Sequence, residues 1–367
     1  MILKSVEIKN FRNLKNISLS FSPSVNIILG KNAQGKTNLL EAIWLLSGNK
    51  SFRGAQDKEL FNFDEQSFFI GAEFLQNDET TEFKIGCTNQ NGKLKKKIFK
   101  NGKIYASQRA LLGSVMMSVF SPDDLELIKS GPSVRRNYCD IILSSLFPSY
   151  YKTLSRYNRI VMQKNALLRD EASDEQIEIW NGQLSVYAAS VTKSRAEFIK
   201  RLLPFAQKYF YEMTSMKEEL TVFYQSTITE DIEKDENEIA NEFLEKLNKN
   251  MFKEKAAGSC LYGPHRDEIS ININSKEARS FASQGQQRSA VLALLLAKTE
   301  LMRQHSGKAP IVLLDDVMSE LDEGRQKYLL EKINDFQVFI TCCQDEIFKS
   351  KENQTFIVNG GEILKKE

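Results

Sequence analysis

The sequence predicts an α/β fold interrupted by a mainly helical insert, and three observations carry that prediction. An apolar strand, a glycine-rich loop and an apolar-periodic helix follow one another within residues 25–46. From residue 122 to about residue 255, apolar side chains recur at spacings of three and four, which is typical of helices. After Cys260 strands and helices alternate again. The two outer segments are therefore expected to complete one sheet around the insert.

The first segment, residues 1–121, shows short alternating patterns around the glycine-rich loop. Turn signals at Asn91-Gly92 and Asn101-Gly102 separate the later patterns, as expected for hairpins. The expected strands are 3–8, 17–21, 68–74, 81–87 and 95–99.

The insert is expected to span residues 122–257 and the last segment residues 258–367. Within the insert the expected helices are 148–169, 176–211 and 228–253. In the last segment the expected strands are 268–273, 311–314 and 337–341, the helices are 287–303 and 325–334, and a hairpin pairs 355–358 with 362–364.

Composition excludes several classes of protein. With 41% hydrophobic and 27% charged residues, the chain is typical of a soluble globular protein without membrane spans. The N-terminus lacks the apolar core of a signal peptide, so a cytoplasmic location is expected. The five cysteines are scattered without a C-x-x-C pair and there are two histidines, which argues against a disulfide framework or a zinc site. A net charge of +2 does not by itself indicate a polyanionic partner.

The glycine-rich loop matches G-x-x-x-x-G-K-T, and a strand precedes it and a helix follows it, as a Walker A phosphate loop requires. Backbone N–H groups and the helix N-terminus would hold the phosphates of a nucleoside triphosphate, which we expect to be ATP. Lys36 would reach the β and γ phosphates, and the Thr37 hydroxyl would ligate Mg²⁺. The expected nucleotide contacts in the loop are Gly30, Lys31, Asn32, Ala33, Gln34, Gly35, Lys36, Thr37 and Asn38.

The second candidate motif is the acidic pair Asp315-Asp316, which directly follows the apolar strand 311–314. Ligands of open α/β sheets lie at such strand ends, so this is a candidate Walker B motif. Asp315 would hold Mg²⁺ through water, and Asp316 would polarise the attacking water. Two acids after a strand could instead cap the next helix, a minority interpretation once a Walker A motif stands in the same chain.

A third candidate is the segment Ser283-Gln284-Gly285-Gln286-Gln287-Arg288, which opens an apolar helix. Ser283, Gly285 and Gln286 at a helix N-terminus can hold an anion. A sheet already carrying Walker A and B cannot easily present this segment to the same phosphate, which predicts a composite site completed by a second copy of the chain. A plain helix cap is the alternative.

These residues together carry a resemblance. The segment at Ser283 looks like the signature motif of ABC-type ATPases, and Ser319-Glu320-Leu321-Asp322 is similar to their D-loop. Among them the chain resembles the bacterial RecF family over essentially its full length. The stretches that decide it are Asn10 to Leu14, Lys31 to Ile43, Phe120 to Leu125, Arg135-Arg136, Gly263 to Asp267, Ser283 to Arg288 and Leu314 to Val317.

The resemblance implies an ABC-type ATPase head, a mixed sheet with a phosphate loop, interrupted by a helical lobe. It implies that ATP drives dimerisation on double-stranded DNA, that hydrolysis releases the dimer, and that the protein acts with RecR and RecO to load RecA at gaps with single-strand/double-strand junctions. The resemblance also implies weak, DNA-stimulated ATPase activity. Asp316 stands where transporters carry the longer Glu, which favours slow, switch-like hydrolysis. In related heads, arginines placed like Arg12 and Arg53 approach phosphate or couple the nucleotide to DNA, and a surface salt bridge is the alternative. Thr341 would contact the γ-phosphate region in place of a switch histidine.

DNA contacts are predicted from local basic clusters, since phosphate neutralisation gives sequence-independent binding. The clusters are the hairpin lysines Lys93, Lys95, Lys96, Lys97, Lys100 and Lys103, the pair Arg135 and Arg136, and the helical run Lys152, Arg156, Arg159, Lys164 and Arg169. A solvated charged face is the alternative for each. A transporter ATPase subunit and an SMC-like structural protein are the rival classes, although the insert is atypical of the former and too short for the coiled coil of the latter.

Overall fold

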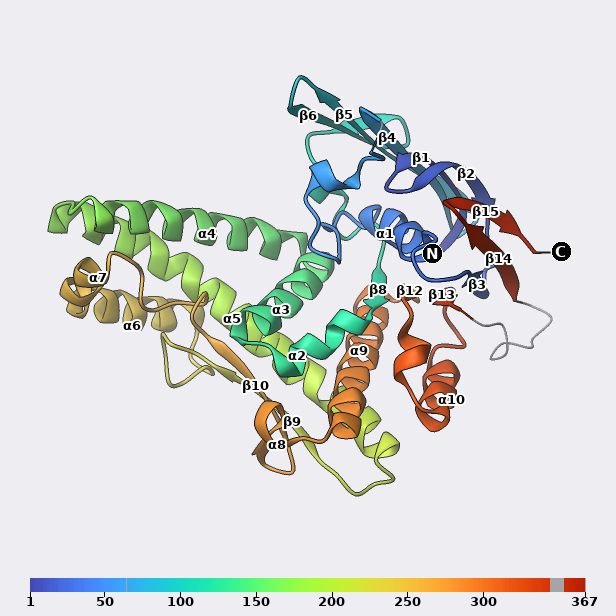
Figure 1. Cartoon of the computed structure of the whole chain (residues 1–367). Coiled ribbons are helices and arrows are strands. Elements are labelled where there is room, and N and C mark those ends of the chain that lie inside the picture. Colours follow the sequence, from blue (N-terminus) through green and yellow to red (C-terminus); the bar gives the residue numbers. More distant parts are fainter. Residues whose placement is uncertain (64, 344–352, 367) are drawn as a thin grey trace. The chain divides into compact units, whose positions relative to one another are not determined.

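The computed structural model describes residues 1–63, 65–343 and 353–366, and the chain forms two compact units (Figure 1). The first unit combines Met1–Asp124 with Lys298–Glu367, and the second is Leu125–Ala297. The helical segment is therefore an insert in the first unit, as the sequence indicated.

The second boundary of the insert differs from the expected one at 257/258 and falls at 297/298. The reason is a strand pairing. β10 (Glu268–Ile273) pairs antiparallel with β9 (Leu220–Gln225), so residues after 258 are joined to the insert rather than to the first unit.

One of the two main sheets in the first unit is antiparallel, with the order β2-β1-β4-β5-β6-β7. Its strands confirm the five predicted in the first segment and add a sixth. They are β1 (Ile2–Phe11), β2 (Leu14–Ser20), β4 (Ser67–Gln76), β5 (Glu79–Gln90), β6 (Lys93–Lys100) and β7 (Lys103–Tyr105). The turns at Asn91-Gly92 and Asn101-Gly102 have positive φ at both residues, which suits tight hairpins.

The other sheet of the first unit is parallel except for its edge strand β15, with the order β15-β14-β3-β13-β12-β8. Its strands are β3 (Val25–Leu29), β8 (Met117–Phe120), β12 (Ile311–Leu314), β13 (Val338–Cys342), β14 (Gln354–Asn359) and β15 (Glu362–Lys365). This sheet joins both ends of the chain. The two outer segments thus complete one sheet around the insert, as expected, while the hairpin-linked N-terminal strands form a second sheet of their own.

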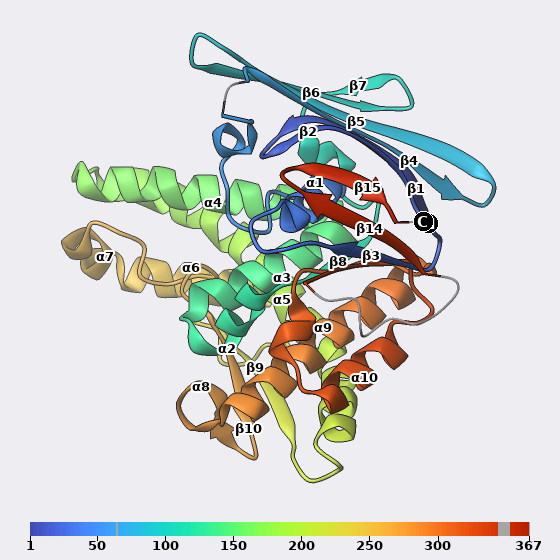
Figure 2. The same cartoon turned by 45° about the vertical axis from the view of Figure 1, so that its right-hand side comes forward.

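Helix α1 (Lys36–Leu45) lies between these two sheets and packs against β1 and β13 (Figure 2). Because two sides of this helix are covered, it does not need a wide polar face. Leu39, Leu40 and Ile43 are accordingly completely buried. Helix α10 (Glu323–Lys332) and three 3₁₀ turns complete the first unit: η1 (Asp57–Leu60), η2 (Gln108–Leu111) and η4 (Val317–Glu320). A further turn, η3 (Pro122–Leu125), ends at the boundary between the units.

The second unit is mainly helical, with a small sheet of order β11-β10-β9. The predicted helix 148–169 is confirmed as α4, but residues 228–235 are not helical and the strand β9 was missed. The elements are α2 (Glu126–Lys129), α3 (Pro132–Leu146), α4 (Pro148–Arg169), α5 (Asp174–Met213), α6 (Glu236–Lys249), α7 (Met251–Ala257), β11 (Lys276–Glu277) and α8 (Ala278–Phe281). Helix α9 (Gln284–Ser306) begins in this unit and ends in the first. No helix in the described ranges combines the length and apolar character needed to cross a bilayer.

Candidate nucleotide site

The phosphate loop, residues 30–37, joins β3 to α1. Gly35 has a φ of 117°, a conformation that favours glycine. A Cβ atom at Gly35 would lie 2.7 Å from Oδ1 of Asn13, so the space beside the loop is already occupied. Both the backbone conformation and the neighbour therefore require glycine at this position.

Lys36 is the first residue of α1, and its amine turns back into the loop. Nζ donates to the carbonyl oxygens of Gly30 at 2.7 Å and Lys31 at 3.2 Å, and it lies 3.4 Å from Sγ of Cys343. Lys36 is only 6% exposed. Because charged phosphate oxygens are stronger acceptors than carbonyls, a phosphate in the loop would be a better partner for this amine.

The Thr37 hydroxyl joins the phosphate loop to the acidic strand end. It donates to Oδ1 of Asp315 at 2.8 Å, and Oγ1 of Thr341 reaches the same oxygen at 3.0 Å. Asp315 is 6% exposed, and burial raises the pKa of its carboxyl above the ordinary value, although the two hydroxyl hydrogen bonds oppose that shift. The result is a buried carboxylate whose hydrogen bonds come from neutral donors.

Thr37 and Asp315 are suited to bind a magnesium ion that is also coordinated by the phosphates of the nucleotide. Mg²⁺ is usually held by one or two carboxylates together with substrate phosphates and water, and both side chains offer oxygen. Within the described residues no cluster of three or more His, Cys, Asp or Glu side chains could hold a metal alone. Thr37 and Asp315 are therefore the residues that would hold Mg²⁺ here.

Asp316 follows β12 in a left-handed conformation, with a φ of 51°. Aspartate tolerates this region better than most residues. Its N–H donates to Oγ1 of Thr341 at 2.8 Å, and its carbonyl accepts from Oγ of Ser319 at 2.8 Å. Thr341, which is completely buried, thus fixes both acidic residues. Its contact with a γ-phosphate remains a prediction.

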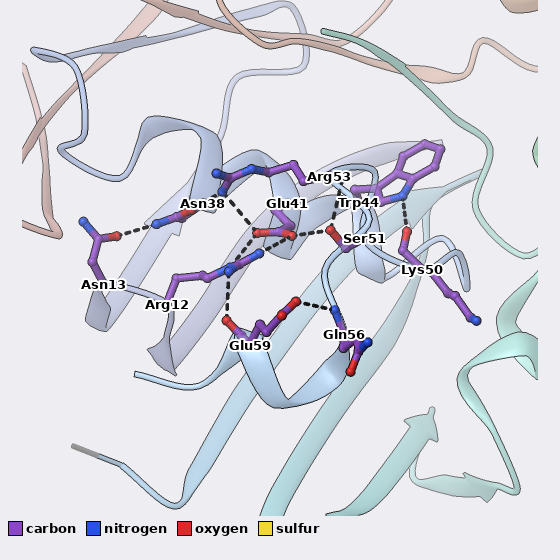
Figure 3. A network of polar contacts seen from close by, with 10 residues as sticks. All are labelled: Arg12, Asn13, Asn38, Glu41, Trp44, Lys50, Ser51, Arg53, Gln56 and Glu59. Carbon is purple, nitrogen blue, oxygen red and sulfur yellow. Dashed lines mark hydrogen bonds and ion pairs between the residues drawn. The ribbon is translucent and has the colours of Figure 1, made fainter. Parts of the chain in front are cut away.

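Arg12 and Arg53 both approach the fully buried carboxylate of Glu41 (Figure 3). Arg12 binds it through Nε and Nη2, each at 2.9 Å, and donates from Nη1 to the carbonyl of Glu59 at 2.8 Å. Arg53 lies 3.8 Å from the same carboxylate and its side chain is 42% exposed, against 19% for Arg12. Arg12 is therefore committed to this network, while Arg53 retains the more accessible guanidinium.

Asn13 and the turn of the β14–β15 hairpin hold the phosphate loop from outside the motif. Nδ2 of Asn13 donates to the Gln34 carbonyl at 2.9 Å, which also accepts the Gly361 N–H at 3.0 Å. Oδ1 of Asn13 accepts from Asn38 at 2.8 Å (Figure 3). A Cβ atom at Gly361 would lie 2.0 Å from the Asn13 carbonyl oxygen, so the close approach depends on glycine. The loop is held by residues far apart in the sequence.

A cavity of about 880 Å³ adjoins the phosphate loop within the first unit. Gly35, Lys36 and Thr37 line it, together with Arg53, residues 58–59 and residues 61–63. Ligand sites typically enclose roughly 300–1,000 Å³, so this cavity has the size of a small-molecule site.

The predicted signature segment lies in the second unit, where Ser283 caps α9. Its Oγ accepts from the Gln286 N–H at 3.3 Å, and its own N–H donates to Oε1 of Gln286 at 2.7 Å, which is a reciprocal cap. The Gln286 amide also donates to Glu218 at 2.5 Å. Ser283 is nevertheless exposed, and accepting a bond does not use the proton of its hydroxyl. The cap is therefore compatible with anion binding.

The predicted DNA residues fall into two groups. Lys95 and Lys97 are exposed and point to one face of β6, because alternate residues of a strand share a face. Lys96 points the other way and donates to Asp57 and Gln108, each at 2.7 Å.

The pair Arg135 and Arg136 is engaged inside the second unit. Arg135 is 7% exposed and binds both carboxylate oxygens of Glu268, at 2.9 and 3.0 Å. Arg136 donates to the Asp267 carbonyl at 2.6 Å. Lys164, predicted on a basic helical surface, is completely buried and binds Glu254 at 2.6 Å, so its assignment to that surface is wrong.

Sequence reasoning gave no separate role to Asn13, Glu41 or the Gly360-Gly361 turn. Asn13 and Glu41 lie within stretches that carry the family resemblance, and that resemblance is the only signal the sequence offers for them. The five cysteines are free thiols, and Cys343 is exposed beside the phosphate loop.

A sheet with a phosphate loop, a carboxylate beside its threonine and a helical insert defines an ATPase head of the ABC type. The sequence profile of the RecF/RecN/SMC N terminal domain matches residues 2–362. An SMC head domain from Pyrococcus furiosus shares the fold, with a TM-score of 0.55 at 14% identity.

Closer matches define the family. The chain is 39% identical to the DNA replication and repair protein RecF of Clostridium novyi, covering 93% of this chain and 92% of the relative. It is 36% identical to that of Clostridioides difficile, covering 99% and 98%. A solved structure described as the recombination mediator protein RecF-ATP in the RecFOR pathway matches with a TM-score of 0.92 at 36% identity, covering 100% and 98%. The chain belongs to the RecF family.

Proposed function

We propose that this chain is an ATPase that binds double-stranded DNA and acts in DNA replication and repair. The observation that carries the proposal is the 2.8 Å hydrogen bond from Thr37 to Asp315, which brings the Walker A and Walker B residues to one point. The RecF names of its relatives and the solved RecF-ATP structure support ATP as the ligand.

In this site, different residues of the chain would have separate roles in phosphoryl transfer. Lys36 neutralises charge on the β and γ phosphates, and backbone N–H groups of residues 30–37 hold their oxygens. Mg²⁺, held by Thr37 and Asp315, supplies charge neutralisation when bound. Asp316 orients the attacking water. An aspartate is shorter than a glutamate, which favours slow, switch-like hydrolysis.

The second unit supplies the proposed dimer contact. Ser283 is exposed at the N-terminus of the long helix α9, where backbone N–H groups favour an anion. In a dimer this segment would close over the ATP held by the other copy. ATP binding would then favour the dimer, and hydrolysis would release it.

DNA binding is assigned to the exposed lysines of the antiparallel sheet rather than to Arg135, whose guanidinium is engaged internally. Lys95 and Lys97 present charge without a base-reading element, which suits binding at any sequence. By family, the partners proposed are RecR and RecO, with RecA loaded at single-strand gaps, in the cytoplasm.

Sedimentation velocity of the full chain with Mg²⁺-ATP tests the composite site. The wild type should shift from monomer to dimer on adding ATP, and Ser283→Arg should remain monomeric while still binding ATP. Ser280→Arg is the matched control, because Ser280 is exposed three residues earlier. Normal dimers of Ser283→Arg would contradict the composite site.

A further inference from the structure

An acidic side chain lies at the start of α9, although the first turn of this helix carries no acidic residue of its own. The carboxylate comes from Glu218, 68 positions before its partner, and its Oε1 accepts a hydrogen bond from Nε2 of Gln286 at 2.5 Å. The same Gln286 side chain accepts the N–H of Ser283 at 2.7 Å. Glu218 is therefore bound to the residue that completes the cap of the signature segment, and all three residues belong to the second unit.

The loop that carries Glu218, between α5 and β9, is fixed at both ends. At its start the Met216 N–H donates to the carbonyl of Tyr211, in the last turn of α5, at 2.9 Å. At its end the Glu219 N–H donates to Oδ1 of Asn274 at 2.9 Å, and the Asn274 N–H donates to the Glu219 carbonyl at 2.9 Å. The backbone on both sides of Glu218 is thus anchored, which keeps its carboxylate within reach of α9.

A carboxylate at this place has a physical consequence for the proposed dimer. The N-terminus of a helix favours negative charge, because the helix dipole and the N–H groups of the first turn point toward it. In the proposed dimer the triphosphate held by the other copy would approach the same N-terminus. Two negative groups repel each other at such short range, so Glu218 and the phosphates compete for one position. Rotation of the Glu218 side chain away from Gln286 would open that position.

We propose that Glu218 is an autoinhibitory residue, whose carboxylate occupies the signature segment of the free chain and has to leave before that segment closes over the ATP of another copy. This inference rests on the proposed function, because it concerns the segment that completes the composite site. A contact that must break before association lowers the apparent affinity by the fraction of chains in which it is broken. Glu218 therefore raises the chain concentration at which ATP produces dimers.

Sedimentation velocity of the full chain over a concentration series, with Mg²⁺ and a non-hydrolysable ATP analogue, measures the dissociation constant of the dimer. Glu218→Gln keeps an acceptor for Gln286 and removes only the charge, so this constant should fall about 3- to 10-fold. Glu219→Gln is the matched control, because it removes the same charge from the adjacent, exposed residue of the loop. It should change the constant by less than about twofold. A dissociation constant of Glu218→Gln equal to or above that of wild type would overturn the inference.

Salt concentration separates charge repulsion from a structural role of Glu218. Salt screens the interactions of solvent-accessible charges, so the difference between Glu218→Gln and wild type should shrink as salt is added. A difference that is independent of salt would show that the charge is not its cause. Glu218→Ala should also dimerise more tightly than wild type, and weaker dimers would show that Glu218 supports the cap instead. A wild type that stays monomeric with the analogue would remove the composite site itself, a result distinct from equal dimerisation of wild type and Glu218→Gln.

Discussion

Glu254 in the second unit and Asp315 in the first are both buried acids, yet their partners differ. Glu254 is completely buried and receives the ammonium of Lys164, itself completely buried, at 2.6 Å. Asp315 is 6% exposed and receives two hydroxyls, from Thr37 and Thr341. A buried charge is tolerated when an opposite charge and hydrogen bonds compensate it. Glu254 is therefore a structural residue, while the charge of Asp315 is left for a cation that comes with the ligand.

The largest effect should come from breaking the internally neutralised pair. Lys164→Met leaves Glu254 buried without its cation, which should lower the free energy of unfolding by about 3–5 kcal/mol. Chemical denaturation measures it. Lys164→Met combined with Glu254→Gln should recover most of the loss, because no buried charge then remains. A single variant as stable as wild type would show that the pair is not a structural element.

Asp315→Asn should instead spare the fold and remove catalysis. Without this carboxylate the metal and the phosphates are misplaced, so the ATP hydrolysis rate should fall on the order of 10²–10³-fold. Asp335→Asn makes the same change at an exposed position of the first unit and is the control. Phosphate release assays at saturating Mg²⁺-ATP decide the matter, and a rate within twofold of wild type would remove Asp315 from the site.

The lysines of β6 show the same contrast, because Lys96 is bound within the chain whereas Lys95 and Lys97 are exposed. Converting both Lys95 and Lys97 to Gln should lower the slope of log affinity against log salt for duplex DNA by about 2, near one per lost phosphate contact. Lys96→Gln removes one charge on the other face, where Asp57 and Gln108 already bind the lysine, and should leave the slope unchanged. Fluorescence anisotropy across a salt series gives the slopes. Equal slopes for the double variant and wild type would move DNA to another surface.

The smallest predicted effect is a pH dependence of stability from Asp315. Burial raises its pKa in the folded chain above the ordinary 3.8, so the folded state holds this proton more tightly than the unfolded state. Stability therefore falls as pH rises from 3.8 through the raised pKa, and the loss is complete above it.

Without divalent metal, Asp315→Asn should therefore melt about 2–4 °C higher than wild type at pH 7, a difference of roughly 1 kcal/mol. The difference should shrink as the pH is lowered. Thermal melts over a pH series measure it, and a pH-independent difference would show that the burial of this charge is not its source.

The parts of the site predictable from sequence are those in which neighbouring residues act together. The phosphate loop lies within eight consecutive residues, and Asp315-Asp316 mark a strand end, so strand, loop and helix signals located both. Thr341 could be placed near the nucleotide from the sequence. Its hydrogen bond to Asp315 could not be predicted, because it depends on β13 lying beside β12, and the sequence of a strand does not reveal its neighbours in the sheet.

Residues whose role depends on a distant partner escaped sequence analysis. In the sequence, Lys164 looks like another surface lysine of a polar helix, because its partner Glu254 lies 90 positions away. The Gly361 turn reads as a simple hairpin, although its N–H binds the phosphate loop at Gln34. The boundary of the insert shifted for the same reason, since the pairing of β9 with β10 joins segments that composition assigns to different regions.

If ATP occupancy switches this chain onto duplex DNA, as proposed, one binding experiment reveals it directly. Duplex affinity is measured for wild type and Asp316→Asn with ATP, with ADP and without nucleotide, at one salt concentration. ATP, but not ADP, should strengthen binding by wild type, and Asp316→Asn with ATP should remain bound because hydrolysis no longer releases it. Equal affinity with and without ATP in both proteins would contradict the account.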